Sequence, residues 1–502
     1  MMTATNIHYE PASRVRGLSA GGIGAIFLLA QKVALIQEID SKLHLLKKHL
    51  PYHESDHVLN IAFNILAGGL CIEHLELRRN DEVYLDALGA QRIPDPTTAG
   101  DFCRRFSEAD VLTLMDAINE ARLRVWEQQP PEFFDEAIVE ADGSIVPSDA
   151  ECKHGMDFTY DGQYGYHPLV VSLANTAEPL FLLNRSGNRP SQEQAGEYLN
   201  KAVALCGRAG FRKILLRGDT RIAENKDLDS WDDQILLREG TRVAETQNLD
   251  SWDEAGNIRF LFGSAAYDSL KARADALPAH AYRLLNRPPR YEVKTAPRQK
   301  PERVKPEIVR RRGYENIELL EEMVAEFDYR PTACQKRYRM IVLRKRVGVD
   351  KGQIRLFEEY RYFFYITNDW EMTAEAVVFS ANDRCDQENL IAQLKSGVRA
   401  LRTPVDDLVS NWAYLVMGSL AWSLKAWSAL LVPVTPRHRA QHETERRTLL
   451  RMEFATYREA FVRMPCQLVR TGRRLIYRFL SWNPWQGVFL RLVERLQACR
   501  LC

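Results

Sequence analysis

The pattern of the chain changes at Phe133 from long helical stretches to short extended ones, and this change restricts the fold most. The elements expected after it are, in order, strands over 137–142, 164–173 and 180–184, a helix over 191–209 and a strand over 213–217. Three strands, a helix and another strand are typical of an α/β layer, so we expect a mixed sheet flanked by helices.

Two of these strands lead directly to an aspartate. Asp142 closes the first strand, and Asp219 comes just after the last one. Ligands of α/β sheets gather at the carboxyl ends of the strands, so both aspartates are candidates for a functional site. Each aspartate also has a structural alternative. Asp142 could be a turn residue, with Glu140 as the ligand on the same strand face, and Asp219 could cap a helix at Thr220.

A third acid lies in 384–395, which contains no Gly or Pro and is predicted to be one helix. At 100° per residue, Arg384, Glu388 and Lys395 fall within a sector of about 40°, so one carboxylate stands between two cations. That face could hold an acidic polymer. The alternative is a solvent-exposed face with one Arg–Glu pair four residues apart.

Acids from distant parts of a chain suit the chemistry of phosphodiesters. Cutting or joining such a bond requires that the entering and leaving oxygens are both stabilised, which two divalent ions about 3.5–4 Å apart achieve. Such ions bind oxygen ligands, above all carboxylates. Asp142, Asp219 and Glu388 meet this requirement, and Arg384 and Lys395 would then contact DNA phosphates.

The charge is balanced as a whole, with 68 basic and 67 acidic residues, but it is unevenly distributed. Residues 283–312 carry eleven Lys and Arg against three Glu, and residues 437–500 carry fourteen Arg against five Glu. Such surpluses favour contact with a phosphate backbone, although ordinary helices with solvated charges would show the same pattern. Five prolines in the first segment exclude a continuous helix there.

Cysteine content and apolar runs restrict the compartment. Nine scattered cysteines, without an N-terminal signal peptide, favour a reducing cytoplasm. The apolar run 408–434 is interrupted by Asn411 and Lys425, so we interpret it as a buried core helix and expect no membrane partner.

The N-terminal part is predicted to be mostly helical. Its apolar periods run over 23–50, 56–77 and 109–128. A short helix capped by Thr98 would present Arg104 and Arg105 to solvent. An exposed basic helix is compatible with DNA binding and equally with a plain helical bundle.

A 21-residue unit is repeated after the second candidate aspartate, because 214–232 recurs as 235–253. One duplicated unit is not a solenoid, so we interpret it as a tandem insertion. Only the first copy has Asp219. The second copy has Gly240 at that position, with Glu239 beside it as a rival acid.

The predicted organisation has five regions. They are a helical domain over 1–130; the first part of an α/β core over 131–256, with the repeat at 214–255; a strand-rich basic insertion over 257–380; the completion of the core over 381–434; and an Arg-rich helical C-terminal region over 435–502. Strands are expected in the insertion over 259–262, 340–343 and 361–366.

Taken together, these motifs resemble the DDE transposases of bacterial insertion sequences, specifically insertion-sequence group 1380. The last acid of this branch lies in a Tyr-x2-Arg-x3-Glu-x6-Lys signature, here Arg384, Glu388 and Lys395. The stretches that carry the resemblance are 78–82, 94–106, 140–144, 164–175, 188–191, 216–220, 384–395, 410–414 and 470–474. They span nearly the whole chain, which makes the match specific.

The resemblance implies an RNase H-like core that cleaves and transfers DNA strands at the inverted terminal repeats of its element. It also implies Mg²⁺ as cofactor, two ions per site with Mn²⁺ as a substitute, double-stranded DNA as partner, a homodimer in the synaptic complex and a bacterial, nucleoid-associated location. The implied metal ligands are Asp142, Asp219 and Glu388, and the implied DNA contacts are Arg384, Lys395, Arg104, Arg105, Arg473 and Arg474.

The sequence departs from the family pattern in two places. The tyrosine of the signature falls on Ala381, and the repeat after Asp219 is not expected. Two alternative functions therefore stay open: an RNase H-like nuclease without strand transfer, and a DNA-binding derivative that has lost catalysis.

Overall fold

The computed structural model describes most of the 502 residues. The described ranges are 15–49, 51–190, 193–218, 247–287, 307, 311–312, 315–332, 334–351, 354–472 and 474–498. The chain divides into two compact units, each assembled from separate segments. Unit 1 consists of Met1–Phe133, Gly143–Arg189 and Glu388–Cys502, and unit 2 consists of Phe134–Asp142 and Pro190–Gln387.

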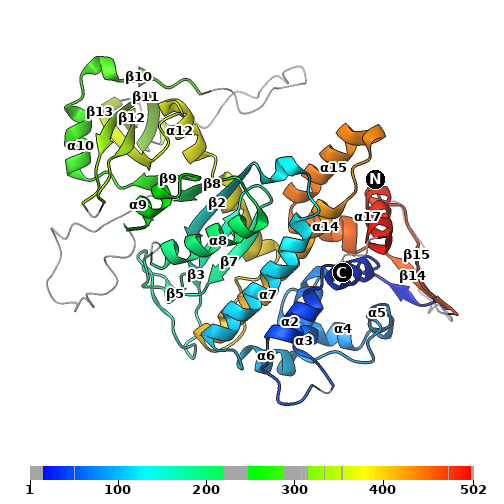
Figure 1. Ribbon diagram of the computed structural model, residues 1–502. Helices are drawn as coiled ribbons and strands as arrows, with labels where there is room; N and C mark the ends of the chain where they lie inside the picture. Colours follow the sequence, from blue (N-terminus) through cyan, green and yellow to red (C-terminus); the bar gives the residue numbers. More distant parts are fainter. Residues whose placement is uncertain are drawn as a thin grey trace. The chain divides into compact units, whose positions relative to one another are not determined.

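Unit 1 is mainly helical and is built around α14 (Leu408–Leu431), in which every residue from Ser410 to Leu431 is buried. Its other helices are α1 (Ile23–Lys32), α2 (Leu35–Lys42), α3 (Glu54–Leu66), α4 (Leu75–Arg79), α5 (Glu82–Leu88), α6 (Pro96–Cys103), α7 (Glu108–Trp126), α15 (Arg439–Arg451), α16 (Phe454–Tyr457) and α17 (Gln486–Ala498) (Figure 1). Both α3 and α7 pack against α14. The N-terminal helices therefore share one core with the C-terminal segment of the chain.

The polar groups of α14 are satisfied by the protein itself. The indole N–H of Trp412 donates to the carbonyl of Leu182 at 2.5 Å, and that of Trp422 donates to Ala177 at 2.6 Å. This burial confirms the prediction of a core helix. Within the described ranges, no single helix has the length and apolarity of a membrane span, and only α14 taken together with Pro436–Arg451, bent by 104°, meets that test.

The predicted strand 164–173 is divided in two. It forms β5 (Tyr164–Tyr166) and β6 (Leu169–Leu173), because Pro168 between them has no N–H to continue a ladder. β6 pairs antiparallel with β7 (Glu178–Leu183), and β5 pairs antiparallel with two short strands. These are β3 (Val146–Pro147) and β4 (Asp157–Phe158).

The C-terminal region is not all helical, which corrects the prediction for 435–502. After α15 and α16 the chain forms a hairpin of β14 (Cys466–Thr471) and β15 (Arg474–Phe479), to which β1 (Gly17–Leu18) adds a third antiparallel strand. The alternating exposure along β15 is the period-two pattern of a strand. Gly472 has a φ of +53°, which suits a tight turn. In the sequence, the many arginines of this region concealed the alternation of β15.

Unit 2 contains a mixed sheet. Its strands are β2 (Glu136–Gly143), β8 (Lys213–Gly218), β9 (Ile258–Ser264), β10 (Arg283–Leu284), β11 (Glu315–Tyr329), β12 (Tyr338–Lys351) and β13 (Ile354–Thr367). β2, β8 and β9 are parallel, and β13, β12, β11 and β10 continue the sheet from β9 as antiparallel neighbours. The helices of unit 2 are α8 (Ala195–Ala209), α9 (Gln247–Glu254), α10 (Asp268–Asp275) and α12 (Ala374–Asn382) (Figure 1).

The predicted strands over 137–142, 213–217, 259–262, 340–343 and 361–366 are confirmed. The prediction that a separate insertion begins at residue 257 is corrected, because β9 is hydrogen-bonded to both β8 and β13. The residues Phe260, Leu261 and Phe262 of β9 are all buried, as expected for a strand inside a parallel sheet. The acidic strand β11 was not predicted.

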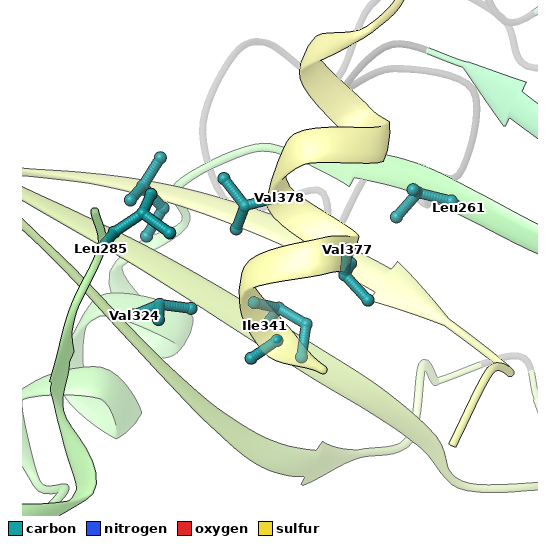
Figure 2. Packing of buried hydrophobic residues seen from close by; sticks show 8 residues of the cluster. Leu261, Leu285, Val324, Ile341, Val377 and Val378 are labelled. Carbon is teal, nitrogen blue, oxygen red and sulfur yellow. The ribbon is translucent and has the colours of Figure 1, made fainter. Parts of the chain in front are cut away.

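Helix α12 is held on the antiparallel part of this sheet by apolar contacts. Figure 2 shows Val377 and Val378 of α12 beside Val324 of β11 and Ile341 of β12. Leu261 of β9 belongs to the same buried cluster. Helix α12, which precedes Arg384, is therefore packed on the sheet.

Two further predictions are corrected in detail. The helix expected over 384–395 is α13 (Cys385–Ala392) followed by a π-helical turn over Gln393–Gly397, so the angle of 100° per residue no longer holds at Lys395. Helix α6 is capped by Asp95, whose carboxylate accepts from the Thr98 N–H at 2.9 Å, and not by Thr98. Most of the 21-residue repeat lies outside the described residues; only β8 and α9 are described.

Candidate active site

Asp142 lies at the carboxyl end of β2, beside the parallel strand β8. The residues Ala137, Val139 and Ala141 of β2 are buried, which fixes the strand in the sheet. The last paired residues of the two strands are Ala141 and Gly218. Asp142 therefore stands at the carboxyl ends of the parallel strands, where ligands of α/β sheets usually bind.

The rival acid Glu140 is engaged inside the sheet. Its carboxylate pairs with the Arg217 guanidinium at 2.7 Å, and the two side chains are 1% and 5% exposed. The same guanidinium donates to the Ser380 carbonyl of α12 at 2.9 Å. A carboxylate that is 1% exposed beside a guanidinium is less accessible to a metal ion than one that is 23% exposed, so Asp142 is the better candidate of the two.

Asp142 is held more loosely, by Arg384. The distance from the Arg384 Nη2 to the Asp142 Oδ2 is 3.6 Å, and the side chains are 17% and 23% exposed. The structure therefore brings together two of the residues singled out in the sequence. It gives Arg384 a contact within the protein that the sequence did not predict.

The other two acids are placed differently. Asp219 lies outside the described residues, which end at Gly218 on this strand. Glu388 is exposed on α13 and belongs to unit 1, whereas Asp142 belongs to unit 2. Among the described residues, no three His, Cys, Asp or Glu side chains gather as a metal site.

Arg104 is neutralised by two aspartates of unit 1. Its guanidinium contacts Asp101 at 2.9 Å and Asp406 at 2.7 Å. Hydrogen bonding to Asp406 raises the pKa of Arg104 and lowers the pKa of Asp406. The neighbouring Arg105 is also exposed, as the sequence predicted.

The remaining basic candidates differ in accessibility. Lys395 is exposed in the π-helical turn, and Arg473 lies outside the described residues. Arg474 is exposed on β15, opposite Thr471 of β14. Arg478 is also exposed on this strand, so the hairpin presents two arginines on one face.

A buried carboxylate in unit 1 escaped the sequence analysis. Glu178, the first residue of β7, is fully buried and pairs with Arg122 of α7 at 3.0 Å. The indole N–H groups of Trp427 and Trp126 donate to it at 2.7 and 3.2 Å. The repeated tryptophans of α14 were the available signal, since a buried indole N–H needs an acceptor.

Comparisons with known proteins show what this chain is similar to. The family model described as Transposase DDE domain group 1 matches residues 16–501. No curated protein matches the chain. Among solved structures, 7 chains match. One of them is the piggyBac transposase in a cryo-EM structure of its synaptic complex with hairpin DNA, at 9% identity and a TM-score of 0.32, covering 88% of this chain and 82% of that one. A likeness this low assigns no role to any residue.

Proposed function

This chain belongs to the DDE transposase family, described as Transposase DDE domain group 1, and from that premise we propose the reaction that it performs. It cleaves DNA at the inverted terminal repeats of a bacterial insertion sequence of group 1380 and joins the freed ends to target DNA. The mixed sheet of unit 2 is the central part of an RNase H-like core in this proposal. The observation that carries it is the accessible carboxylate of Asp142 at the edge of the parallel strands.

Asp142, Asp219 and Glu388 would hold the divalent ions that DDE transposases use. The fit is good for Asp142, because it offers a hard oxygen ligand whose side chain is 23% exposed. Glu388 is exposed as well. When bound, a pair of Mg²⁺ ions would stabilise the entering and leaving oxygens of the phosphodiester.

The protein's own side chains position the DNA. Arg384 keeps the Asp142 carboxylate oriented and adds a positive charge where the scissile phosphate would lie. Lys395, Arg105 and Arg474 are exposed cations that would contact the phosphate backbone. A homodimer would bring two element ends together.

The test is to incubate the full chain with DNA that carries the terminal repeats, a target plasmid and Mg²⁺, and to resolve the products. The proposal predicts nicked, double-cut and joined species that disappear when the metal is chelated. Cutting without joining would assign the chain to the nucleases instead.

One alternative function has an observation in its favour. Asp219 lies in the first copy of the 21-residue repeat, and an inserted second copy so close to a metal ligand could disable it. The chain would then be a DNA-binding derivative without catalysis. It would bind the terminal repeats with steep salt dependence and leave them uncut at every metal concentration.

A further inference from the structure

A cavity lies among the N-terminal helices of unit 1. It is formed by α1, α3, α5 and the segment that follows α5, and its volume is about 440 Å³. Pockets that bind small organic ligands span about 300–1,000 Å³. The residues that line it include Phe27, Tyr52, Asp56, Asn60, Phe63, Tyr84, Ala90, Gln91 and Arg92.

Aromatic rings form the walls of this cavity. Phe27 and Phe63 meet at right angles, with ring centroids 6.3 Å apart. Tyr52 rests edge-on against His57, which in turn stacks on Phe102 with a centroid distance of 4.3 Å. Rings that are fixed by their neighbours offer flat surfaces at little cost in conformational entropy.

Polar groups in the cavity have unused hydrogen-bonding capacity. Tyr84 is 1% exposed, and its hydroxyl makes no hydrogen bond with another residue in the described ranges. Asn60 donates its amide to the Pro94 carbonyl at 2.9 Å, which leaves the amide oxygen to accept from a ligand. Both residues line the cavity, and neither side chain is among the described buried polar atoms left without a partner, so both can be solvated in the empty cavity and can bond a ligand instead.

The charges in the cavity restrict the kind of ligand. Asp56 and Arg92 contribute one negative and one positive group, and the Arg92 guanidinium lies 5.8 Å from the centre of the Tyr52 ring. Balanced charge disfavours a bare anion or cation. An alkyl chain would leave the amides and hydroxyl unsatisfied. A flat heterocycle with donors and acceptors on its rim can stack on the aromatic rings and form hydrogen bonds with the polar groups.

We propose that this cavity binds a nucleobase, in particular an unpaired base of the DNA on which the chain acts. The base would stack on the aromatic walls, while Asn60 and Asp56 accept from its amino group and Tyr84 donates to a ring nitrogen or carbonyl. The DNA source rests on the proposed function. A free nucleoside carries the same chemistry and is the competing source.

The experiment uses the full chain and single-stranded DNA that contains 2-aminopurine, whose fluorescence is quenched when the base stacks. Ala90→Trp fills the cavity, and Ala109→Trp adds the same ring at an exposed position of α7 as the matched control. We expect Ala90→Trp to remove the quenching and weaken binding about tenfold, since stacking on protein rings contributes about 1–3 kcal/mol per base. Tyr84→Phe, which keeps the ring, should weaken binding about threefold.

Equal quenching by Ala90→Trp and Ala109→Trp would overturn the proposal. Equal affinity for the free 2-aminopurine nucleoside would overturn its DNA part and assign the cavity to nucleosides. The measurement is made without divalent ions, and also on Asp142→Asn. If the wild-type chain cleaves DNA but does not quench 2-aminopurine, only the cavity proposal is refuted. If the wild-type chain quenches 2-aminopurine but never cleaves DNA, only the transposase proposal is refuted.

Discussion

Two ion pairs in this molecule show how burial separates a structural carboxylate from an available one. Glu178 and Arg122 in unit 1 are 0% and 1% exposed, lie 3.0 Å apart, and receive two further indole donors. Asp142 and Arg384 in unit 2 are 23% and 17% exposed and lie 3.6 Å apart. The first carboxylate is fully buried and held at short distance, whereas the second is partly exposed and lies farther from its guanidinium.

The same contrast appears within one strand. Glu140 and Asp142 lie two residues apart on the same face of β2, yet Arg217 encloses only the first. A metal ion can replace a weakly held guanidinium at Asp142, but it would have to break a buried pair at Glu140. Substitutions at these pairs test the contrast, from the largest effect to the smallest.

The largest effect is expected at the metal ligands. Asp142→Asn, Asp219→Asn and Glu388→Gln should each lower metal-dependent cleavage by about a thousandfold or more, because each removes one ligand charge. DNA binding should be retained, as measured by a gel-shift titration. Glu136→Gln removes the same charge from the exposed start of β2 and should leave cleavage unchanged. Full activity in any of the three variants would reject that residue as a ligand.

The next effect concerns the enclosed pair. Glu178→Gln leaves the buried Arg122 charge without compensation, so the free energy of unfolding should fall by about 3–5 kcal/mol in denaturant titrations. Glu76→Gln, which breaks the exposed pair with Arg79, is the control and should lower the free energy of unfolding far less. Equal losses in the two variants would show that burial does not distinguish these pairs.

Lys425 extends the comparison to a buried charge that has no acidic partner among the described residues. Burial lowers its pKa from 10.5 to about 7, and its amine donates to the Leu450 carbonyl at 2.8 Å. Between these pKa values the unfolded chain binds more protons than the folded chain. The free energy of unfolding should therefore rise with pH from 7 to 10.5, by up to about 1.4 kcal/mol per pH unit. Lys425→Met should remove this part of the slope, and an unchanged slope would show that other groups cause it.

The smallest effect is expected at the loose pair. Arg384→Gln should change the free energy of unfolding by less than about 1 kcal/mol, because the pair is partly exposed. If the guanidinium contacts a phosphate in the complex, the variant should bind DNA more weakly and release about one counterion fewer, which lowers the slope of log K against log salt concentration by about one. A salt slope equal to that of the wild type would confine Arg384 to its contact with Asp142.

The sequence predicted well those elements whose pattern is local. Alternation and apolar runs located β2 and β8, and the interrupted apolar stretch was identified as the core helix α14. Elements whose composition disagrees with their state were missed. The glutamates of β11 favour a helix, and the arginines of β15 obscured its alternation.

The contacts of the site depend on tertiary packing and were harder to predict. The sequence ranked Asp142 above Glu140 but gave no sign that Arg217 encloses the latter, because residues 77 positions apart meet only through strand register. The sequence assigned Arg384 to DNA contact. Its contact with Asp142 depends on the packing of α12 against the sheet, which the sequence did not show. Arg104 is exposed as predicted, but its ion pair with Asp406 from a distant segment was not predicted.

The most direct test of the contrast is Mn²⁺ binding, measured by electron paramagnetic resonance on the full chain with Asp142→Asn and with Glu140→Gln, each checked for folding by circular dichroism. An accessible Asp142 and an enclosed Glu140 predict that the bound-ion signal is lost in the first variant and kept in the second. A signal that survives Asp142→Asn, or that disappears only in a folded Glu140→Gln, would contradict this account.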